Sequence, residues 1–556
     1  MNLSQHPRDT RTRRTLPPAR LVWQTPENPP ARLEILFEAN TGQALAGSTR
    51  VCALPPGCGF VLDFGHELYG GVQIVTCATP GKLPAKVRIR FGESVSETFG
   101  SPDNDHAMHD LQVELPPMGS VEVGNTGFRF VRIDSLSDGL IELLGFRAIS
   151  MLREEPQLGA FQSPDSRLNQ IWQVGADTVQ LCMQEYLWDG IKRDRLAWIG
   201  DLHPETQVVS AVWGEHPIVP ATLDFVRDTT PLPGWMNGIS SYSMWWILIH
   251  RDWYLRHGNL TYLKAQREYF VPLMRRMLEQ ADASGLERVE PWRFLDHPSA
   301  NDPDALRAGL HALLLQTLEA GETLAGRLDE HEVASLCKET VRLMRRHQPA
   351  LQPQCKGASA LLAITGLREA GEVNREVLAR DPLHGLSTFF GYYVLQGRAK
   401  AGDYCGALEV IRRYWGGMLD LGATSFWEHF ELDWLENAGR IDELPSPATV
   451  DVHATYGSGC FTGHRHSLCH GWAAGPTAWL SEHVLGFRPL EPGSTTLLLD
   501  PHLGDLVWAE GAFPTGSGVV RVRHERRAGR VETQVEAPAG IEIVHPSDLN
   551  HEFTTC

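Results

Sequence analysis

Cysteine, basic charge and long apolar runs are all scarce in this sequence, and each shortage excludes a class of protein. The 10 cysteines are scattered over 556 residues without zinc-ribbon or CxxC spacing, so we expect reduced thiols and no disulfide framework. Lys and Arg number 50 against 68 Asp and Glu, a formal net charge of −18, which argues against nucleic acid or an anionic membrane as the main partner. No run of 18 apolar residues is present to span a membrane.

The N-terminal stretch is basic but has no apolar segment behind it, so neither a secretory nor a twin-arginine signal is predicted. We therefore expect a cytoplasmic protein. The remaining composition, 42% hydrophobic and 21% charged, is that of a globular protein. The 16 tryptophans are compatible with a site that stacks on the flat faces of sugar rings, although core packing is the ordinary use of most tryptophans.

Three sequence patterns follow one another along the chain. Residues 1–155 are rich in β-branched and aromatic residues with partial alternation, and Gly- and Pro-containing turns separate them. Residues 156–487 carry helical periodicity, and residues 488–556 return to short strand patterns. We predict a multidomain α+β protein with an N-terminal β-sandwich, a central helical domain and a small C-terminal β-sandwich. The number of helical segments fits hairpins arranged as a repeat or as a closed toroid.

Two local features mark the change from strands to helices. The polar segment 92–110 has no periodicity, so we expect a long loop there, of the kind that is often functional or mobile. Helical periodicity then begins after Ser163 and Pro164, which suit an N-cap and a first helical position.

Charged residues and tryptophans cluster twice in the helical region. Residues 188–205 interleave acidic and basic side chains with two tryptophans, and residues 422–434 place Glu428 next to Trp427. Two carboxylates from distant segments, flanked by Trp and Arg, suggest glycoside hydrolysis, which needs a protonated carboxyl on one side of the sugar and a carboxylate on the other. An apolar wall of Trp raises the pKa of the acid. The alternative for the first cluster is an exposed loop with weak ion pairs.

A third cluster contains three histidines, His464, His466 and His470, together with Trp472. Histidines so close together could suggest a metal. Their spacing has neither an adjacent cysteine nor an HExxH pattern, so no dedicated metal site is predicted.

The stretch 189–201 resembles the signature of bacterial α-L-rhamnosidases, glycoside hydrolase family 78. That family commonly shows Asp-Cys-Pro, two positions, a Glu, and then Gly-Trp-x-Gly-Asp. Asp189 matches the opening residue, and Trp198 and Asp201 match the closing part. Asp194 stands where the family places its general-acid Glu.

Three features depart from that signature. Gly190 and Ile191 stand in place of Cys-Pro, and Ala197 stands in place of Gly. Asp194 is one methylene shorter than Glu, a loss of reach of roughly an ångström that costs about a hundredfold in rate unless the neighbourhood is adjusted. Either the pocket is rebuilt around Asp194, or another carboxyl is the acid, or the protein is a weak or altered enzyme.

The other clusters extend the resemblance. Residues 422–429 look like the family's Gly-Ala-Thr-x-x-Trp-Glu motif, which implies Glu428 as the general base. Residues 467–480 look like the segment whose histidine lines the sugar pocket, here His470. Both ends of the chain are similar to the β-sandwich domains that flank the family's catalytic domain.

The resemblance implies an (α/α)6 toroid of helical hairpins for the central domain, and inverting hydrolysis of terminal α-L-rhamnosides without a cofactor. Asp194 would protonate the glycosidic oxygen, and Glu428 would activate water from about 6.5–9.5 Å away. No metal and no calcium-dependent binding module is implied. The residues expected to bind the carbohydrate substrate are Asp189, Arg193, Trp198, Asp201, Trp245, Trp292, Asp296, Trp427 and His470.

Two competing functions remain open. One is an enzyme on the same fold that acts on another deoxy or uronic sugar, either as a glycosidase or as a lyase. The other is a catalytically silent sugar-binding protein, which is the outcome if the change from Glu to Asp at position 194 is a loss.

Overall fold

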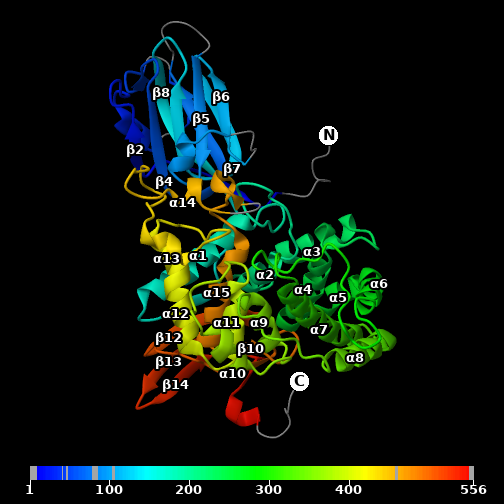
Figure 1. Ribbon diagram of the computed structural model, residues 1–556. Coiled ribbons are helices and arrows are strands. Elements are labelled where there is room, and N and C mark those ends of the chain that lie inside the picture. The colour runs from blue at the N-terminus through cyan, green and yellow to red at the C-terminus, as the bar shows by residue number, and fades with distance from the viewer. Residues whose placement is uncertain are drawn as a thin grey trace.

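The computed structural model describes residues 9–39, 42–45, 48–77, 85–102, 107–457 and 461–549. A sheet domain, a helical domain and a smaller group of strands follow one another from one end of the molecule to the other (Figure 1). Within the described ranges, no helix is long and apolar enough to cross a membrane. The cysteines in these ranges are free thiols, as predicted.

The N-terminal domain is an antiparallel sheet of eight strands in the order β1-β8-β4-β7-β5-β6, with β2 paired to β4 and β3 paired to β8. Alternating apolar residues favour an antiparallel sheet, and among the pairs of its described strands only β5 and β6 are consecutive in the chain. The strands are β1 (Thr12–Leu16), β2 (Arg20–Gln24), β3 (Cys52–Leu54), β4 (Gly59–Thr76), β5 (Ala85–Gly92), β6 (Asp110–Leu115), β7 (Gly119–Ser135) and β8 (Ile141–Leu152).

The long strand β4 bends, and its two halves contribute to one apolar core of the N-terminal domain. Its first half pairs with β2 and its second half with β8, and its register with β7 shifts between Asp63 and Leu68. Such a shift lets a strand bend without losing its pairing on either side. Phe60 from the first half and Ile74 from the second half therefore share one apolar cluster, together with Phe128 of β7.

The helical domain follows the predicted periodicity, with a correction at its start. Asp165, not Ser163, is the N-cap of the first helix: its carboxylate accepts the backbone N–H groups of Arg167 and Leu168. An Asp side chain at this position satisfies two of the free N–H groups of the first turn. The helices are α1 (Ser166–Cys182), α2 (Leu202–Val212), α3 (Ile218–Thr229), α4 (Ser240–His257), α5 (Leu260–Ala265), α6 (Arg267–Leu278), α7 (Pro303–Arg327), α8 (His331–Met344), α9 (Lys356–Ile364), α10 (Ala370–Val373), α11 (Gly391–Lys400), α12 (Tyr404–Val410), α13 (Gly416–Asp420), α14 (Val452–Thr455) and α15 (Gly475–Trp479).

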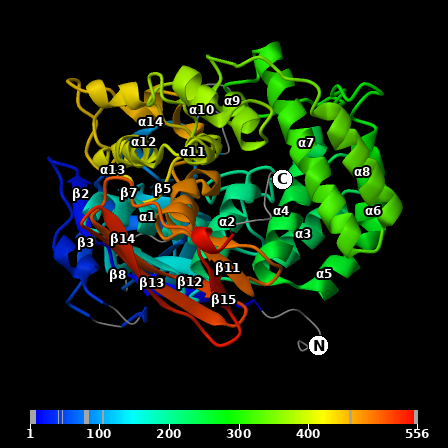
Figure 2. The same ribbon diagram turned by 90° about the horizontal axis from the view of Figure 1, so that it is seen from below.

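The C-terminal strands form two small sheets across the far end of the helices (Figure 2). One sheet has the order β14-β13-β12-β9, and its strand β9 (Ala160–Gln162) precedes α1 in the chain. Residues 160–162, which the sequence assigns to the helical domain, thus pair with β12 of the C-terminal sheet. The other strands are β10 (Phe487–Pro489), β11 (Thr496–Leu499), β12 (Trp508–Thr515), β13 (Gly518–Arg527), β14 (Arg530–Glu536) and β15 (Glu542–Val544).

The N-terminal sheet is joined to the helical domain through buried polar contacts. Arg129 of β7 makes two hydrogen bonds to Asp63 of β4, at 2.8 and 2.9 Å, and a third to the carbonyl of Gly422 in the helical domain, at 2.9 Å. Part of the expected loop 92–110 is also packed inside the molecule: residues 93–98 are buried, and residues 96–99 form a 3₁₀ turn. Residues 103–106 lie outside the described residues.

The buried pair of Asp63 and Arg129 predicts a large stability effect. Asp63→Asn leaves the Arg129 guanidinium without its bidentate partner in a buried setting, which costs about 3–5 kcal/mol. We expect a clear fall in the urea midpoint of unfolding. Glu332→Gln, which breaks an exposed ion pair with Arg275, is the control and should leave the midpoint unchanged. Equal midpoints for the two variants would contradict this account of the domain junction.

Candidate active site

The signature segment 189–201 forms a loop between α1 and α2 that is closed at its base. Asp189 and Leu196 are joined twice, because the Asp189 N–H donates to the Leu196 carbonyl at 3.0 Å and the Leu196 N–H donates to the Asp189 carboxylate at 2.9 Å. The turn at the far end places Asp194 and Arg195 at φ angles of +53° and +55°. Strained conformations of this kind in non-glycine residues often occur at functional sites.

Gly190 explains one departure from the family signature. Its backbone pairs with His470, and a Cβ atom at this position would meet the Cys469 carbonyl at 2.9 Å and the His470 ring at 3.0 Å. A larger residue would push the two segments apart. The close approach of the loop to the histidine cluster therefore depends on glycine.

The second and third clusters lie side by side. Glu428 and Ser467 exchange two hydrogen bonds, one from the Glu428 N–H to the Ser467 carbonyl at 3.0 Å and one from the Ser467 N–H to the Glu428 carboxylate at 3.1 Å. The Trp472 indole and the Thr388 hydroxyl both donate to the Glu428 carbonyl. The Glu428 backbone is therefore held on several sides, and its carboxylate is held by the Ser467 N–H.

Arg193 connects the two predicted catalytic carboxylates. Its Nη2 atom contacts both oxygens of Glu428, its Nη1 atom lies 3.4 Å from Asp194 Oδ2, and its Nε donates to the Arg465 carbonyl at 2.8 Å. A single guanidinium contacts both side chains, so their nearest oxygens are at most about 8 Å apart, an upper limit that lies within the roughly 6.5–9.5 Å of inverting glycosidases. The sequence assigns Arg193 to sugar hydroxyls, whereas here it pairs with Glu428.

The charges around the two carboxylates differ. Burial raises the pKa of Glu428, but His470, Arg193 and His466 outweigh it and lower the pKa to about 2, so Glu428 is ionised at neutral pH. The Asp194 side chain is 28% exposed and faces the guanidinium groups of Arg193 and Arg465, the latter at 3.9 Å. Solvent and cations, and not the expected apolar wall alone, therefore surround Asp194.

A second set of carboxyl groups lies around His470, at the base of the loop 189–201. Burial raises the pKa of Asp189 to about 8 and also raises that of Asp201, whose carboxylate accepts the Tyr242 hydroxyl at 3.0 Å. His470 Nε2 lies 3.4 Å from Asp201; burial lowers the histidine pKa, but Glu428 and the two aspartates raise it above its usual value. Asp189 is thus a neutral carboxylic acid at pH 7, whereas Glu428 is ionised.

Glu205 also belongs to this set, and no sequence pattern assigned it a role. Its carboxyl is fully buried without a hydrogen-bond partner among the described residues, it packs against Gly471, and burial raises its pKa well above the usual value. The one available signal was its position on α2, four residues after Asp201, which places both side chains on one face of that helix.

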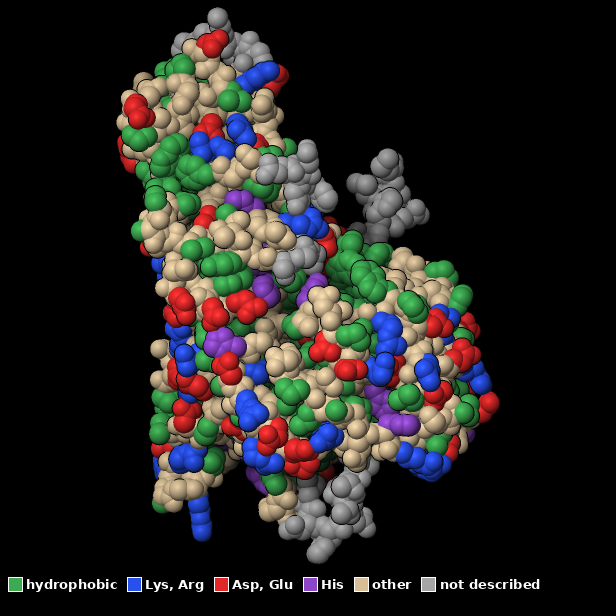
Figure 3. All heavy atoms as spheres, viewed as in Figure 1, with side chains coloured by type: hydrophobic (Ala, Val, Ile, Leu, Met, Phe, Trp, Pro, Cys, Tyr) green, Lys and Arg blue, Asp and Glu red, His purple; other side chains and the backbone are tan. Residues whose placement is uncertain are grey.

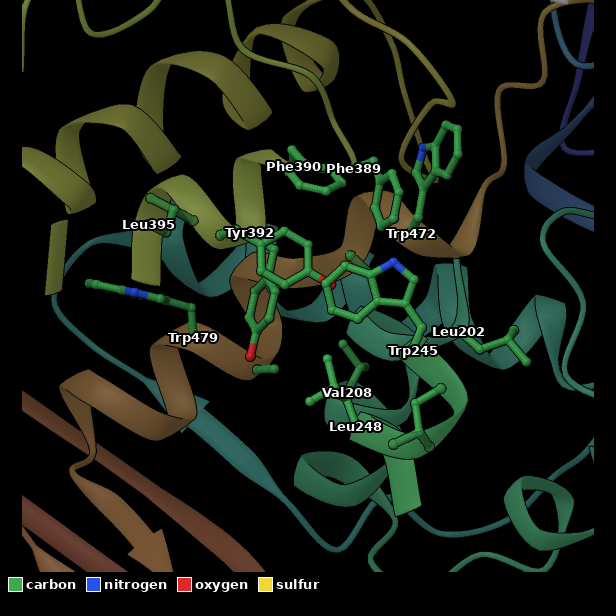
Figure 4. Packing of buried hydrophobic residues seen from close by; sticks show 14 of the residues in the cluster. Leu202, Val208, Trp245, Leu248, Phe389, Phe390, Tyr392, Leu395, Trp472 and Trp479 are labelled. Atoms are coloured by element: carbon green, nitrogen blue, oxygen red, sulfur yellow. The ribbon is translucent and has the colours of Figure 1, made fainter. Parts of the chain in front are cut away.

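The predicted aromatic wall is only partly present. Trp198 is half-buried and meets Tyr242 edge to face at 6.1 Å. Trp245 is wrong as a wall residue, because it is completely buried in the helical core (Figure 4). Its ring packs against those of His203 and Tyr393. Trp427 is 1% exposed, so its ring is covered by protein.

The two remaining predicted residues, Trp292 and Asp296, come from segment 292–298, whose His297 lies within electrostatic reach of Glu428. Trp292 is 66% exposed, and its carbonyl accepts the Ser240 N–H at the start of α4. Asp296 lies in a local turn, where its carboxylate accepts the Ser299 N–H at 3.0 Å, and burial raises its pKa to about 6. Trp472, which the sequence places in the third cluster without a role, stacks on Phe389 at 4.9 Å (Figure 4). Its ring also lies 4.4 Å from that of His470.

A cavity of about 520 Å³ lies elsewhere, between the helical domain and the C-terminal strands. Its lining includes His203, Asp252, Tyr393, Glu482 and Arg488, and none of the predicted site residues contributes to it. Asp252 is already paired with Arg251 and His203. Its volume alone therefore does not make this cavity the reaction site.

The three histidines of the third cluster are not gathered around one point that could hold a metal ion, in the part of the chain that the structure describes. Among the described residues, one group places three metal-ligating atoms within 4.8 Å of one another, namely Glu93, Glu97 and His453. The Lys192 ammonium lies 3.4 and 3.2 Å from the two carboxylates of that group. The positive charge that faces these two carboxylates therefore comes from Lys192 and needs no metal ion. Histidine side chains are visible where the sheet domain meets the helices (Figure 3).

Comparisons with known proteins agree with the sequence resemblance. Residues 156–331 match the family described as the bacterial alpha-L-rhamnosidase 6 hairpin glycosidase domain, and residues 486–545 match the bacterial alpha-L-rhamnosidase C-terminal domain. An alpha-L-rhamnosidase of Alteromonas sp. (strain LOR) is 22% identical over 547 residues, which cover 88% of this chain and 56% of that protein. The chain thus spans little more than half the length of this relative.

Solved structures show the same fold. A GH78 family rhamnosidase of Bacillus sp. GL1 has a TM-score of 0.74 at 21% identity, over 93% of this chain and 56% of that one. A rhamnosidase from Klebsiella oxytoca with rhamnose bound has a TM-score of 0.68 at 19% identity, over 85% of this chain and 96% of that one. The resemblance to bacterial rhamnosidases is confirmed.

The raised pKa of Asp189 predicts a pH-dependent stability. Between about pH 4 and pH 8 the folded protein holds a proton on Asp189 that the unfolded chain has released, so this residue makes stability fall as the pH rises through that window. Asp189→Asn mimics the neutral acid and should weaken the fall in melting temperature from pH 5 to pH 8. An unchanged slope in the variant would show that Asp189 is ionised in the folded protein.

Proposed function

We propose that this chain, which carries the six-hairpin glycosidase and C-terminal domains of bacterial α-L-rhamnosidases, is an inverting glycoside hydrolase that releases terminal α-L-rhamnose. The observation that carries the proposal is the contact of Asp194 and Glu428 with the two Nη atoms of one guanidinium, that of Arg193. We further propose that the helices close into an (α/α)6 toroid and that the flanking sheets are β-sandwiches.

Asp194 is the proposed general acid and Glu428 the proposed general base. Asp194 lies at the end of its loop, partly exposed, where it can take a proton from solvent and reach a glycosidic oxygen. Glu428 is ionised and buried, and it can accept a proton from a water held between it and the anomeric carbon. The reaction breaks the bond from the anomeric carbon to the leaving oxygen and forms a new bond to water on the opposite face.

Arg193 has to change partners for this reaction. While its Nη2 atom contacts both oxygens of Glu428, the carboxylate is a weak base and no water can occupy the same place. We propose that the sugar draws the Nη atoms toward its hydroxyls, while Nε stays on the Arg465 carbonyl. The predicted role of Arg193 in substrate binding and its ion pair with Glu428 are then two states of one side chain.

Substrate binding is proposed for the residues around this gap. Asp201 and His470 form a hydrogen-bonding wall with Tyr242, and Trp198 offers an apolar face for the sugar ring and its methyl group. Asp189, which is neutral and closes the base of the loop, is the alternative acid if the shorter side chain of Asp194 does not reach the leaving oxygen.

Two other functions have their own tests. A lyase or a glycosidase for another deoxy or uronic sugar would be revealed by a panel of aryl glycosides and by an unsaturated product that absorbs in the ultraviolet. A silent sugar-binding protein would bind rhamnose in calorimetry without turnover.

Substitution of the two carboxylates tests the assignment. Asp194→Asn and Glu428→Gln should each lower the rate of p-nitrophenol release from its α-L-rhamnoside by a factor of about 10²–10⁴, because each removes one proton transfer. Asp433→Asn is the control from the same segment, since Asp433 is exposed and pairs with His384. Full activity in either test variant would remove that residue from the mechanism. If Asp194→Asn is active and Asp189→Asn is not, Asp189 is the acid.

The configuration of the product tests the stereochemistry. A single displacement by water gives β-L-rhamnose as the first product, which then mutarotates. Proton NMR of the anomeric region in the first minutes of hydrolysis should show the β anomer first. Initial release of the α anomer would mean retention and would exclude Glu428 as a base acting through water.

A further inference from the structure

A segment of the N-terminal domain reaches the base of the candidate active site. Glu93 Oε2 accepts the Leu468 N–H at 2.6 Å, and the Val95 N–H donates to the Ile441 carbonyl at 2.8 Å. Glu93 and Glu97 are 0% and 2% exposed. Two carboxylates from the sheet domain are therefore buried against the helical domain, a costly placement unless a cation faces them.

Lys192 supplies that cation. Its ammonium lies 3.2 Å from Glu97 Oε1 and 3.4 Å from Glu93 Oε2, and its side chain is 1% exposed. The same ammonium donates to the carbonyl of His466 at 2.9 Å and to that of His464, and it lies 3.3 Å from His453 Nε2. One side chain thus joins the sheet domain, the signature loop and the segment 464–467.

The two carbonyls that Lys192 holds flank the groups that fix the catalytic ion pair. The Arg465 carbonyl, between them, accepts the Arg193 Nε, and the next residue, Ser467, donates its N–H to Glu428. Lys192 itself directly precedes Arg193 in the chain. A shift of this backbone would therefore move the contacts of both Arg193 and Glu428.

We propose that Lys192 is a positioning residue: bound by Glu93 and Glu97 of the N-terminal domain, its ammonium holds the segment 464–467 in the place that keeps Arg193 on Glu428. This inference rests on the proposed function for its kinetic consequence only. The sheet domain then helps to position the site, because it provides the two carboxyl groups, of Glu93 and Glu97, that bind Lys192.

The groups around Glu428 define what should change when Lys192 is lost. Arg193, His470 and His466 face its carboxylate together with the Ser467 N–H, and His297 and Asp201 also lie within its electrostatic reach. Loosening segment 464–467 weakens the contacts of Arg193 and Ser467. The pKa of Glu428 should then rise, and the acid limb of the pH profile should move to higher pH.

The test is Lys192→Met, which keeps the length of the side chain without the charge. We expect kcat to fall by a factor of about 10–100, as for a misplacement of an ångström or less, with a smaller change in KM. The acid limb of kcat/KM should move to higher pH. Lys356→Met is the matched control, because Lys356 is also buried and also donates to two carbonyls, those of Asp381 and His384. It should keep the wild-type acid limb.

Hydrogen exchange supplies a measurement that does not need activity. In Lys192→Met, amides in 93–99 and 464–470 should exchange faster than in the wild type and in Lys356→Met. Glu97→Gln, which leaves Glu93 as a partner, should shift exchange and the acid limb in the same direction but less, and it serves if Lys192→Met does not fold.

The two ideas fail in different ways. If the wild-type protein hydrolyses no aryl rhamnoside, the proposed function is wrong. Hydrogen exchange in the same variants still decides the role of Lys192. A folded Lys192→Met with wild-type exchange in both segments and a wild-type acid limb overturns the inference. The inference is also overturned if Lys192→Met and Lys356→Met lose activity to the same extent and neither variant shifts the acid limb.

Discussion

The candidate site depends on one guanidinium held between two carboxylates. Arg193 is anchored by its Nε to a backbone carbonyl and extends its other nitrogens to Glu428 and toward Asp194. A buried carboxylate without such a partner would take up a proton, and Glu428 would then be useless as a base. The arginine thus keeps Glu428 charged and also occupies the place that a substrate needs.

The surroundings divide the acidic residues of the site into two kinds. Glu428, with Arg193 and histidines around it, remains ionised, whereas Asp189 and Glu205, buried with few cations, hold their protons. Environments that push the pKa values of neighbouring carboxyls apart are a common feature of sites that both give and take protons. Asp194 differs from both kinds, since its side chain is partly open to solvent.

The elements that the sequence predicted are those that a local pattern of apolar residues determines. The C-terminal strands and the long helices follow from periodicity, and Asp194 and Glu428 came from a resemblance to a family, because no spacing rule connects residues so far apart. Strand β9 was missed because three residues become a strand only by pairing with β12. Trp245 and Trp472 are both buried in one apolar cluster, and only packing decides that Trp245 meets Tyr393 while Trp472 meets His470. Segment 93–98 is polar, so its burial against Lys192 had no signal in the sequence.

A crystal structure with L-rhamnose bound tests the central claim most directly. The account predicts the anomeric carbon of the sugar between Asp194 and Glu428, with the Nη atoms of Arg193 moved from Glu428 to sugar hydroxyls and a water on the Glu428 side. Rhamnose bound only in the cavity beside the C-terminal strands, or Arg193 still closed on Glu428 with the sugar elsewhere, would contradict it.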